Sequence, residues 1–136
     1  MKKGVPIHGK TRKSKLAPKK TLKQLKAILW RLFSKFIRKR DGYICYTCGR
    51  AGNDAGHYVP RGKSIALMFD ERNVHCQCNT CNRWKRGNLS VYALNLERDY
   101  GMGILQEFER IRQSSEKLRA ADLEAMIEYY QTKTPL

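Results

Sequence analysis

The sequence has no apolar run approaching the roughly 20 residues that a membrane-spanning helix needs. Its lysine-rich N-terminus is not followed by the apolar core of a secretion signal. We therefore expect an intracellular protein with no membrane partner. Disulfides are rare in that compartment, so the five cysteines are expected to serve another purpose.

Acidic residues are absent from the first 40 positions, which hold 15 of the 28 lysines and arginines. The rest of the chain holds 13 basic and 12 acidic residues, so the net charge of +16 comes almost wholly from the N-terminal part. Such a concentration of positive charge indicates a polyanionic partner, and nucleic acid fits best. The alternative is a solubilising tail with nonspecific affinity for RNA.

Residue patterns divide the chain into a basic disordered arm (1–20), a basic amphipathic helix (21–40), a metal-stabilised core (41–100) and a C-terminal helical extension (101–136). Thr21 is a typical helix N-cap, and Gln24 three residues later completes a capping box. The polar face of this helix carries Lys23, Lys26, Arg31, Lys35, Arg38 and Lys39. This face either meets phosphate or is an ordinary solvated surface.

The core has few helical patterns in its first half, and we expect two short strands, at 57–59 and 73–77. A short helix is expected at about 80–86, and a second one runs to Tyr100 after a cap at Asn88 or Ser90. Helices at about 104–113 and 119–132 follow. They either pair two protomers into a homodimer or complete the core. The fold class is therefore α+β.

Four of the cysteines form two C-x2-C pairs, Cys45 with Cys48 and Cys78 with Cys81. Two such pairs supply the four thiolates of a tetrahedral structural zinc site. Cys76 is outside this pattern and is expected to be an ordinary thiol. One pair in a loop and one at the start of a helix are typical of the treble clef, an arrangement that by itself does not indicate catalysis.

The residues between and after these pairs resemble the HNH, or ββα-metal, nuclease motif in a His-Asn-Asn version. His57 lies between the pairs, Asn73 lies five residues before Cys78, and Asn82 directly follows Cys81. From about residue 30 to the C-terminus, FIRKRDGYICYTCGR, GHYVPRG and FDERNVHCQCNTCNRWKRGN resemble the phage NinG (Rap) recombination proteins. Residues 41–100 would then be a zinc-stabilised, HNH-like nuclease core.

The resemblance implies a structure-specific DNA endonuclease that acts on branched recombination intermediates, such as Holliday junctions and D-loops, in the cytoplasm of the infected bacterium. It implies that His57 is the general base, that Asn73 orients the His57 ring, and that Asn82 binds a catalytic Mg²⁺ or Mn²⁺ ion. These roles suit a histidine with a near-neutral pKa and an oxygen ligand for a hard cation. Recombination proteins are candidate partners.

The sequence departs from the commonest form of the motif at Gly56, where a second metal-binding side chain often stands. Asp54 and His75 are the candidates to replace it, Asp54 because it is the nearest carboxylate and His75 because it shares strand parity with Asn73. The alternatives are a turn residue at Asp54 and a core histidine at His75.

Basic residues surround the motif, and they are the candidate DNA-binding groups: Arg61, Lys63, Arg83, Lys85 and Arg86, together with Arg38 and Lys39 of the N-terminal helix. Any single one can equally be a solvated surface charge. Trp84, beside them, is expected to pack in the core and not to stack on a base. Since no residue is an obvious base reader, recognition of DNA shape is expected.

Three functions remain open at this point. The first is a Mg²⁺-dependent endonuclease for branched DNA. The second, suggested by Gly56, is a noncatalytic zinc-stabilised DNA-binding protein. The third is a sequence-specific HNH nuclease.

Overall fold

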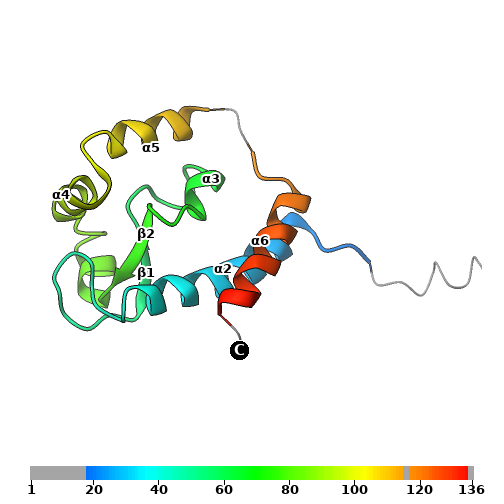
Figure 1. The fold of residues 1–136 in the computed structure, drawn as a ribbon, viewed down its shortest axis with the longest axis horizontal. Coiled ribbons are helices and arrows are strands. Elements are labelled where there is room, and N and C mark those ends of the chain that lie inside the picture. Colours follow the sequence, from blue (N-terminus) through cyan, green and yellow to red (C-terminus); the bar gives the residue numbers. More distant parts are fainter. Residues whose placement is uncertain (1–17, 115–116, 135–136) are drawn as a thin grey trace, which may run out of the picture.

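The computed structural model describes residues 18–114 and 117–134 (Figure 1). Its elements are α2 (Leu22–Arg40), β1 (Asp54–His57), α3 (Ile65–Met68), β2 (Val74–Gln77), the π-helix η1 (Thr80–Trp84), α4 (Leu89–Tyr100), α5 (Ile104–Gln113) and α6 (Ala120–Lys133). Helices and a two-stranded sheet occur together, which confirms the α+β class. Most of the expected disordered arm, residues 1–17, lies outside the described residues.

Helix α2 has the bounds that its sequence predicts. The Thr21 hydroxyl accepts a hydrogen bond from the Gln24 amide at 3.1 Å, and the Gln24 side chain accepts one from the Thr21 amide at 2.8 Å. This confirms the capping box. The helix ends at Asp41, where Gly42 takes a positive φ of 64° that glycine adopts without strain.

The two strands pair antiparallel, with Gly56 opposite His75 and His57 opposite Val74. The first strand spans Asp54–His57, so the expected strand at 57–59 began three residues and ended two residues too far along the chain. The expectation rested on the high β-strand propensity of Tyr58 and Val59. The middle of the actual strand is Ala55 and Gly56, and at Gly56 a Cβ would overlap the Gln77 side chain of the partner strand.

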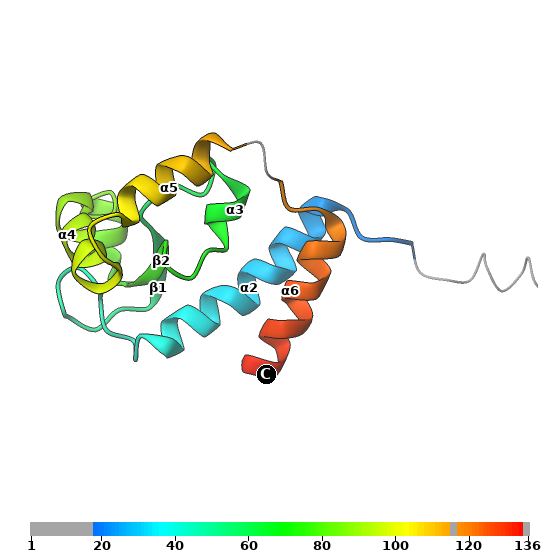
Figure 2. The same cartoon turned by 45° about the horizontal axis from the view of Figure 1, so that its top comes forward.

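Two hydrophobic cores hold these elements together. The first lies between α2, α6 and the hairpin and includes Leu29, Phe33, Val74, Leu123 and Tyr130. The second lies between α3, α4 and α5 and consists of Leu67, Tyr92, Leu96, Ile104 and Phe108. Figure 2 shows α6 beside α2, and α5 over α3. The C-terminal helices thus bury their apolar faces in different parts of their own chain.

Helix α3 was not expected from the sequence, because its single turn is too short for a helical period. The Ser64 hydroxyl caps it by accepting a hydrogen bond from the Leu67 amide at 3.2 Å. Within residues 18–114 and 117–134, no helix has both the length and the apolar character required to cross a bilayer.

Candidate metal centre and active site

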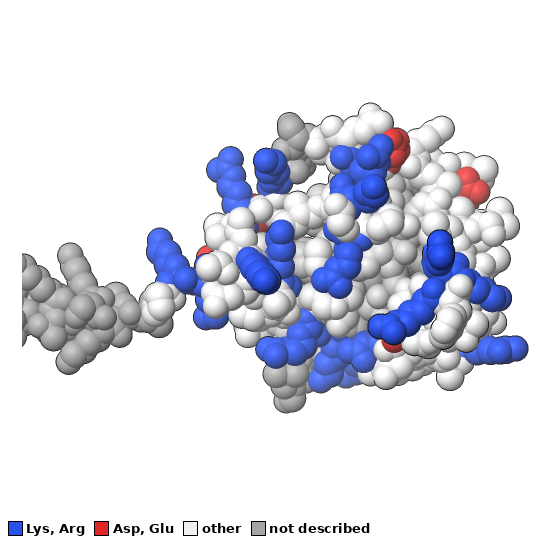
Figure 3. All heavy atoms as spheres, turned by 180° about the vertical axis from the view of Figure 1, so that it is seen from behind, with Lys and Arg blue, Asp and Glu red and all other residues white. Residues whose placement is uncertain are grey.

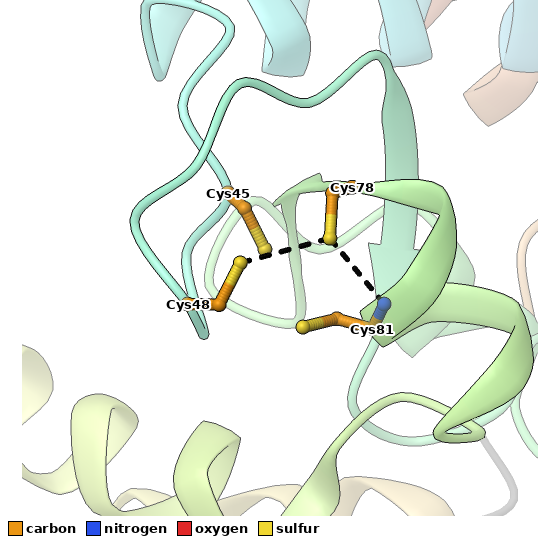
Figure 4. Close-up of side chains that lie close together, drawn as sticks. All are labelled: Cys45, Cys48, Cys78 and Cys81. Atoms are coloured by element: carbon orange, nitrogen blue, oxygen red, sulfur yellow. Dashed lines mark hydrogen bonds between the residues drawn. The ribbon is translucent and has the colours of Figure 1, made fainter.

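Four cysteine side chains converge on one point. Cys45 and Cys48 come from the turn after α2, whereas Cys78 and Cys81 come from the end of β2 and from η1 (Figure 4). Their sulfur atoms all lie within 4.8 Å of one another, and Cys48 Sγ is 3.6 Å from Cys78 Sγ. A tetrahedral zinc ion with Zn–S bonds of about 2.3 Å would hold sulfurs about 3.8 Å apart. The cysteines are therefore positioned to bind a metal ion, and the donor set suits structural zinc.

Cys76 lies outside this cluster, as the sequence predicts. Its side chain is fully buried in β2, and burial raises the pKa of its thiol to about 11. It therefore stays protonated and behaves as a small core residue.

The cysteine cluster fixes the segment that follows it. The Cys81 amide donates to Cys78 Sγ at 3.4 Å, and the Asn88 side-chain amide donates to Cys81 Sγ at 3.6 Å. The expected helix at 80–86 is present as one π-helical turn that ends at Trp84. Its closing backbone bonds run from Lys85 to Thr80 and from Gly87 to Cys81, both 2.8 Å. Asn82 is thereby held at a defined place beside the hairpin.

His57 ends β1 and lies between a carbonyl group and an indole ring. Its Nε2 is 3.0 Å from the Met68 carbonyl oxygen, which can only accept, so Nε2 carries the proton and Nδ1 has the free lone pair. The Trp30 ring of α2 stacks on the imidazole with ring centroids 5.1 Å apart. These contacts lock the orientation of the ring.

The same surroundings keep His57 neutral. Burial lowers the pKa of its imidazole to about 4, and the positive charge of Arg61 acts in the same direction, while the Met68 carbonyl opposes both. This pKa lies below the near-neutral value expected for a general base, but at neutral pH the ring is neutral and its Nδ1 is unprotonated, the state that a proton acceptor needs.

The resemblance implied that Asn73 orients the His57 ring, but the hydrogen bonds of the Asn73 side chain within the described residues go to Val59 and Leu67 and not to the ring, so any such role is indirect. The buried amide group of Asn73 accepts from the Val59 amide at 2.8 Å and donates to the carbonyl groups of Val59 and Leu67 at 3.0 and 2.9 Å. Asn73 stands just before β2, so its side chain reaches the loop after β1 and not the strand itself. It fixes the loop and α3, and the Met68 carbonyl at the end of α3 then fixes the ring.

Asn82 lies where two adjoining surface pockets meet. One pocket is lined by His57, Tyr58, Pro60, Arg61, Asn82, Arg86, Gly87 and Leu89. The other is lined by Trp30, Ser34, Arg38, Asn53, Asp54, Ala55, Asn82 and Arg83. The Asn82 side chain is 3.3 Å from the Asp54 carboxylate. The fold thus brings His57, Asn82 and Asp54 together.

Gly56 is required by packing. Gln77 from β2 is fully buried, and its Oε1 atom occupies the position that a Cβ on Gly56 would take, with Asn82 Oδ1 2.9 Å from the same position. The Gln77 amide donates to Thr47 at 3.1 Å and to the Gly87 carbonyl at 2.9 Å. Its Oε1 has no protein hydrogen-bond partner among the described residues. A buried acceptor without a partner thus lies close to Asn82.

His75 is a core histidine, and the expectation that it binds the catalytic ion is not supported. The Tyr92 hydroxyl donates to the Gly56 carbonyl at 2.7 Å and so accepts from His75 Nδ1 at 3.1 Å. The Tyr100 hydroxyl then donates to His75 Nε2 at 3.0 Å, and Tyr46 stacks on the ring. Both ring nitrogens are occupied, so no lone pair is available to a metal ion.

Four of the seven expected DNA-binding residues line the two pockets, Arg38 and Arg83 one of them and Arg61 and Arg86 the other. Arg38 donates to the Asn53 side chain at 3.2 Å, so α2 supplies one wall of the pocket that contains Asp54. Arg61 lies over the Trp30 ring at 5.0 Å. Lys39, Lys63 and Lys85 are exposed and line neither pocket. Lys and Arg are abundant on the face in Figure 3, where Asp and Glu are sparse.

Trp84 is 81% exposed, so the expectation that it packs in the core was wrong. It is the last residue of η1, and the turn that the cysteines impose points its side chain outward. Sequence reasoning also missed the roles of Trp30, Met68 and Gln77. Trp30 is one of several apolar residues in α2, and nothing in the sequence distinguishes it from the residues that only pack. The role of Met68 belongs to its backbone carbonyl, which the residue type does not reveal.

Comparison with known proteins places the chain in a family. The model of the family described as Bacteriophage Lambda NinG protein matches residues 6–136. The chain belongs to the NinG family. It is 39% identical over 97 residues to Protein ninG of Salmonella phage P22, which covers 65% of this chain and 48% of that protein.

Other relatives are similarly close to this member of the family. Protein ninG of Escherichia phage 933W is 41% identical over 93 residues, covering 62% of this chain and 46% of that protein. Protein ninG of Escherichia phage lambda is 41% identical over 78 residues, covering 54% and 38%. The chain thus spans about half or less of the length of these relatives. No solved structure matches it.

Proposed function

We propose that the chain is a metal-dependent endonuclease of the HNH, or ββα-metal, type that cleaves branched DNA. The observation that carries the proposal is that His57 and Asn82 line one pocket, while Asp54 contacts Asn82 in the adjoining one. The order hairpin, cysteine pair and short helix agrees with that fold type. Membership of the NinG family gives the phage context.

His57 acts as the general base. Its Nδ1 takes a proton from a water molecule, whose oxygen attacks the phosphorus atom while the bond from phosphorus to the 3′ oxygen breaks. The products are a 5′-phosphate and a 3′-hydroxyl, which takes its proton from solvent. The bond from Nε2 to the Met68 carbonyl keeps Nδ1 free and stabilises the imidazolium that forms.

Asp54 and Asn82 are the residues that would hold a divalent cation. A carboxylate oxygen and an amide oxygen are suitable donors for Mg²⁺ or Mn²⁺. Rotation of the Asn82 amide exchanges its nitrogen and oxygen, so the contact with Asp54 is compatible with an oxygen directed at a cation. When bound, such an ion supplies charge neutralisation at the phosphate and at the leaving oxygen.

Branched DNA is favoured by the distribution of charge. Positive side chains come from α2, from the loop after β1 and from η1, so they can meet phosphates of strands that approach from different directions. Recombination proteins and a second copy of the chain remain proposed partners.

A cleavage assay tests the proposal. Zinc-loaded protein is incubated with a four-way junction, a D-loop and a linear duplex, each end-labelled, in the presence of Mg²⁺ or Mn²⁺. Nicks near the branch of the first two substrates are expected. Binding without cleavage of any of them would contradict the proposal and indicate a noncatalytic DNA-binding protein. Cuts at defined sequences of a plasmid would indicate a sequence-specific nuclease.

A further inference from the structure

The side chain of Trp84 projects into solvent from a rigid support. Its ring is 81% exposed, yet it belongs to the turn that begins at the cysteine cluster and is closed by backbone bonds at both Lys85 and Gly87. Trp30, by contrast, contacts Phe33, His57 and Arg61. Within the described residues the Trp84 side chain has no ring contact or hydrogen bond, so most of its surface is available to a ligand.

The residues next to Trp84 in the chain are cationic and exposed. Arg83, Lys85 and Arg86 form no ion pair with the described acidic residues. An exposed aromatic ring on a turn with three cations that form no ion pair fits a nucleic-acid strand, because a base can stack on the ring while the charges meet phosphates. An apolar protein surface would leave these charges without partners.

The neighbours of Trp84 connect it to the candidate active site. Arg83 lines the pocket that contains Asp54, and Arg86 lines the pocket that contains His57. Asn82, two residues before Trp84, lines both pockets. Trp84 itself lines neither pocket, but it directly follows Arg83 in the chain, so a strand whose phosphate lies at this site is within a few residues of the exposed indole ring.

We propose that Trp84, with Arg83, Lys85 and Arg86, forms a binding site for an unpaired nucleobase of the strand held at the His57–Asn82 site. The inference rests on the proposed function. Base faces are covered in a continuous duplex and become accessible at branch points and in single strands. Trp84 therefore gives the protein a preference for branched over fully paired DNA, without reading the sequence.

The test is binding without cleavage. Fluorescence anisotropy of labelled oligothymidylate, four-way junction and duplex is measured without added Mg²⁺ or Mn²⁺. We expect Trp84→Ala to weaken binding of oligothymidylate and junction roughly 10-fold to 100-fold. Binding of duplex should change little, and Trp84→Phe should restore most of the loss. Met102→Ala is the matched control, because Met102 is 76% exposed and has no basic neighbours in sequence.

Salt dependence separates stacking from charge. Trp84→Ala should keep the wild-type slope of affinity against salt concentration, whereas Arg83→Ala should reduce that slope by about one phosphate contact. Quenching of Trp84 fluorescence by oligothymidylate, in a Trp30→Phe variant that leaves Trp84 as the single tryptophan, should report the stacking directly. Equal affinity of Trp84→Ala and wild type for oligothymidylate would overturn the inference.

Failure of the two proposals can be distinguished. If the wild-type protein cuts the junction and Trp84→Ala binds the junction as tightly as the wild type does, only the stacking site is overturned. Wild-type protein that neither binds nor cuts any substrate overturns the proposed function, and the stacking site with it. Loss of self-association in Trp84→Ala, with DNA affinity unchanged, would assign the ring to contact with a second copy of the chain.

Discussion

The indole ring of Trp30 stacks on the imidazole ring of His57, with centroids 5.1 Å apart and planes inclined by 22°. Trp30 belongs to α2, whereas His57 ends β1. The N-terminal basic helix is therefore part of the site and does more than add positive charge. Its aromatic residue covers one face of the imidazole and excludes water from it.

We predict that Trp30→Ala raises the pKa of His57 from about 4 toward the ordinary value of 6.5, because desolvation by burial is the largest cause of its lowered pKa. NMR titration of the imidazole protons measures this, and with three histidines in the chain the spectrum is simple. Trp30→Phe should keep most of the shift. An unchanged His57 titration in Trp30→Ala would show that the stacking does not set its pKa.

Stability should depend on pH through His75. Burial lowers the pKa of this ring to about 4; Arg40 acts in the same direction, and Asp41 and Asp99 oppose it. Between about pH 6.5 and 4 the unfolded chain binds this proton and the folded chain does not. The contribution of His75 to the free energy of unfolding therefore falls as the pH drops through this window, by up to about 3 kcal/mol.

Urea unfolding at several pH values and constant zinc concentration measures this dependence. His75→Phe loses the bonds to Tyr92 and Tyr100 and so is less stable at pH 7, but its stability should fall less steeply toward pH 4 than that of the wild type. The comparison cancels the acid sensitivity of the zinc site, which both proteins share. Parallel profiles would contradict the prediction.

The sequence predicts those parts of the fold that depend on local patterns. The capping box of α2, the cysteine pairs and the last two helices are encoded in neighbouring residues and were found where expected. The environments of Trp84, His75 and Gly56 depend on contacts across the chain and could not be predicted in the same way. Gly56 looked like a missing metal ligand, whereas the structure shows it making room for Gln77.

We predict that a side chain at position 56 is harmful because of Gln77. Gly56→Ala should destabilise the protein by about 1–3 kcal/mol, since its Cβ would overlap Gln77 Oε1. In a Gln77→Ala background the same substitution should cost much less. Urea unfolding of the two single variants and the double variant measures the coupling. Strictly additive effects would mean that the two residues do not compete for this space.

Metal binding should depend on four of the cysteines and not on the fifth. Cys81→Ser is expected to lower the zinc content below one ion per chain and the melting temperature by ten degrees or more, on the order expected when metal binding contributes to folding. Cys76→Ser should keep the zinc, because Cys76 lies outside the cluster. Elemental analysis and calorimetry provide the two readouts. Equal zinc content in both variants would argue against the assigned ligands.

Cleavage of a four-way junction by wild-type protein and by His57→Ala, under single-turnover conditions with Mg²⁺ and at equal zinc content, is the decisive measurement for the role of His57 as general base. We expect nicks near the branch with the wild type and a rate at least about 100-fold lower for His57→Ala, the loss expected when a general base is removed. Equal rates for the two proteins, or no cleavage by the wild type, would contradict this role.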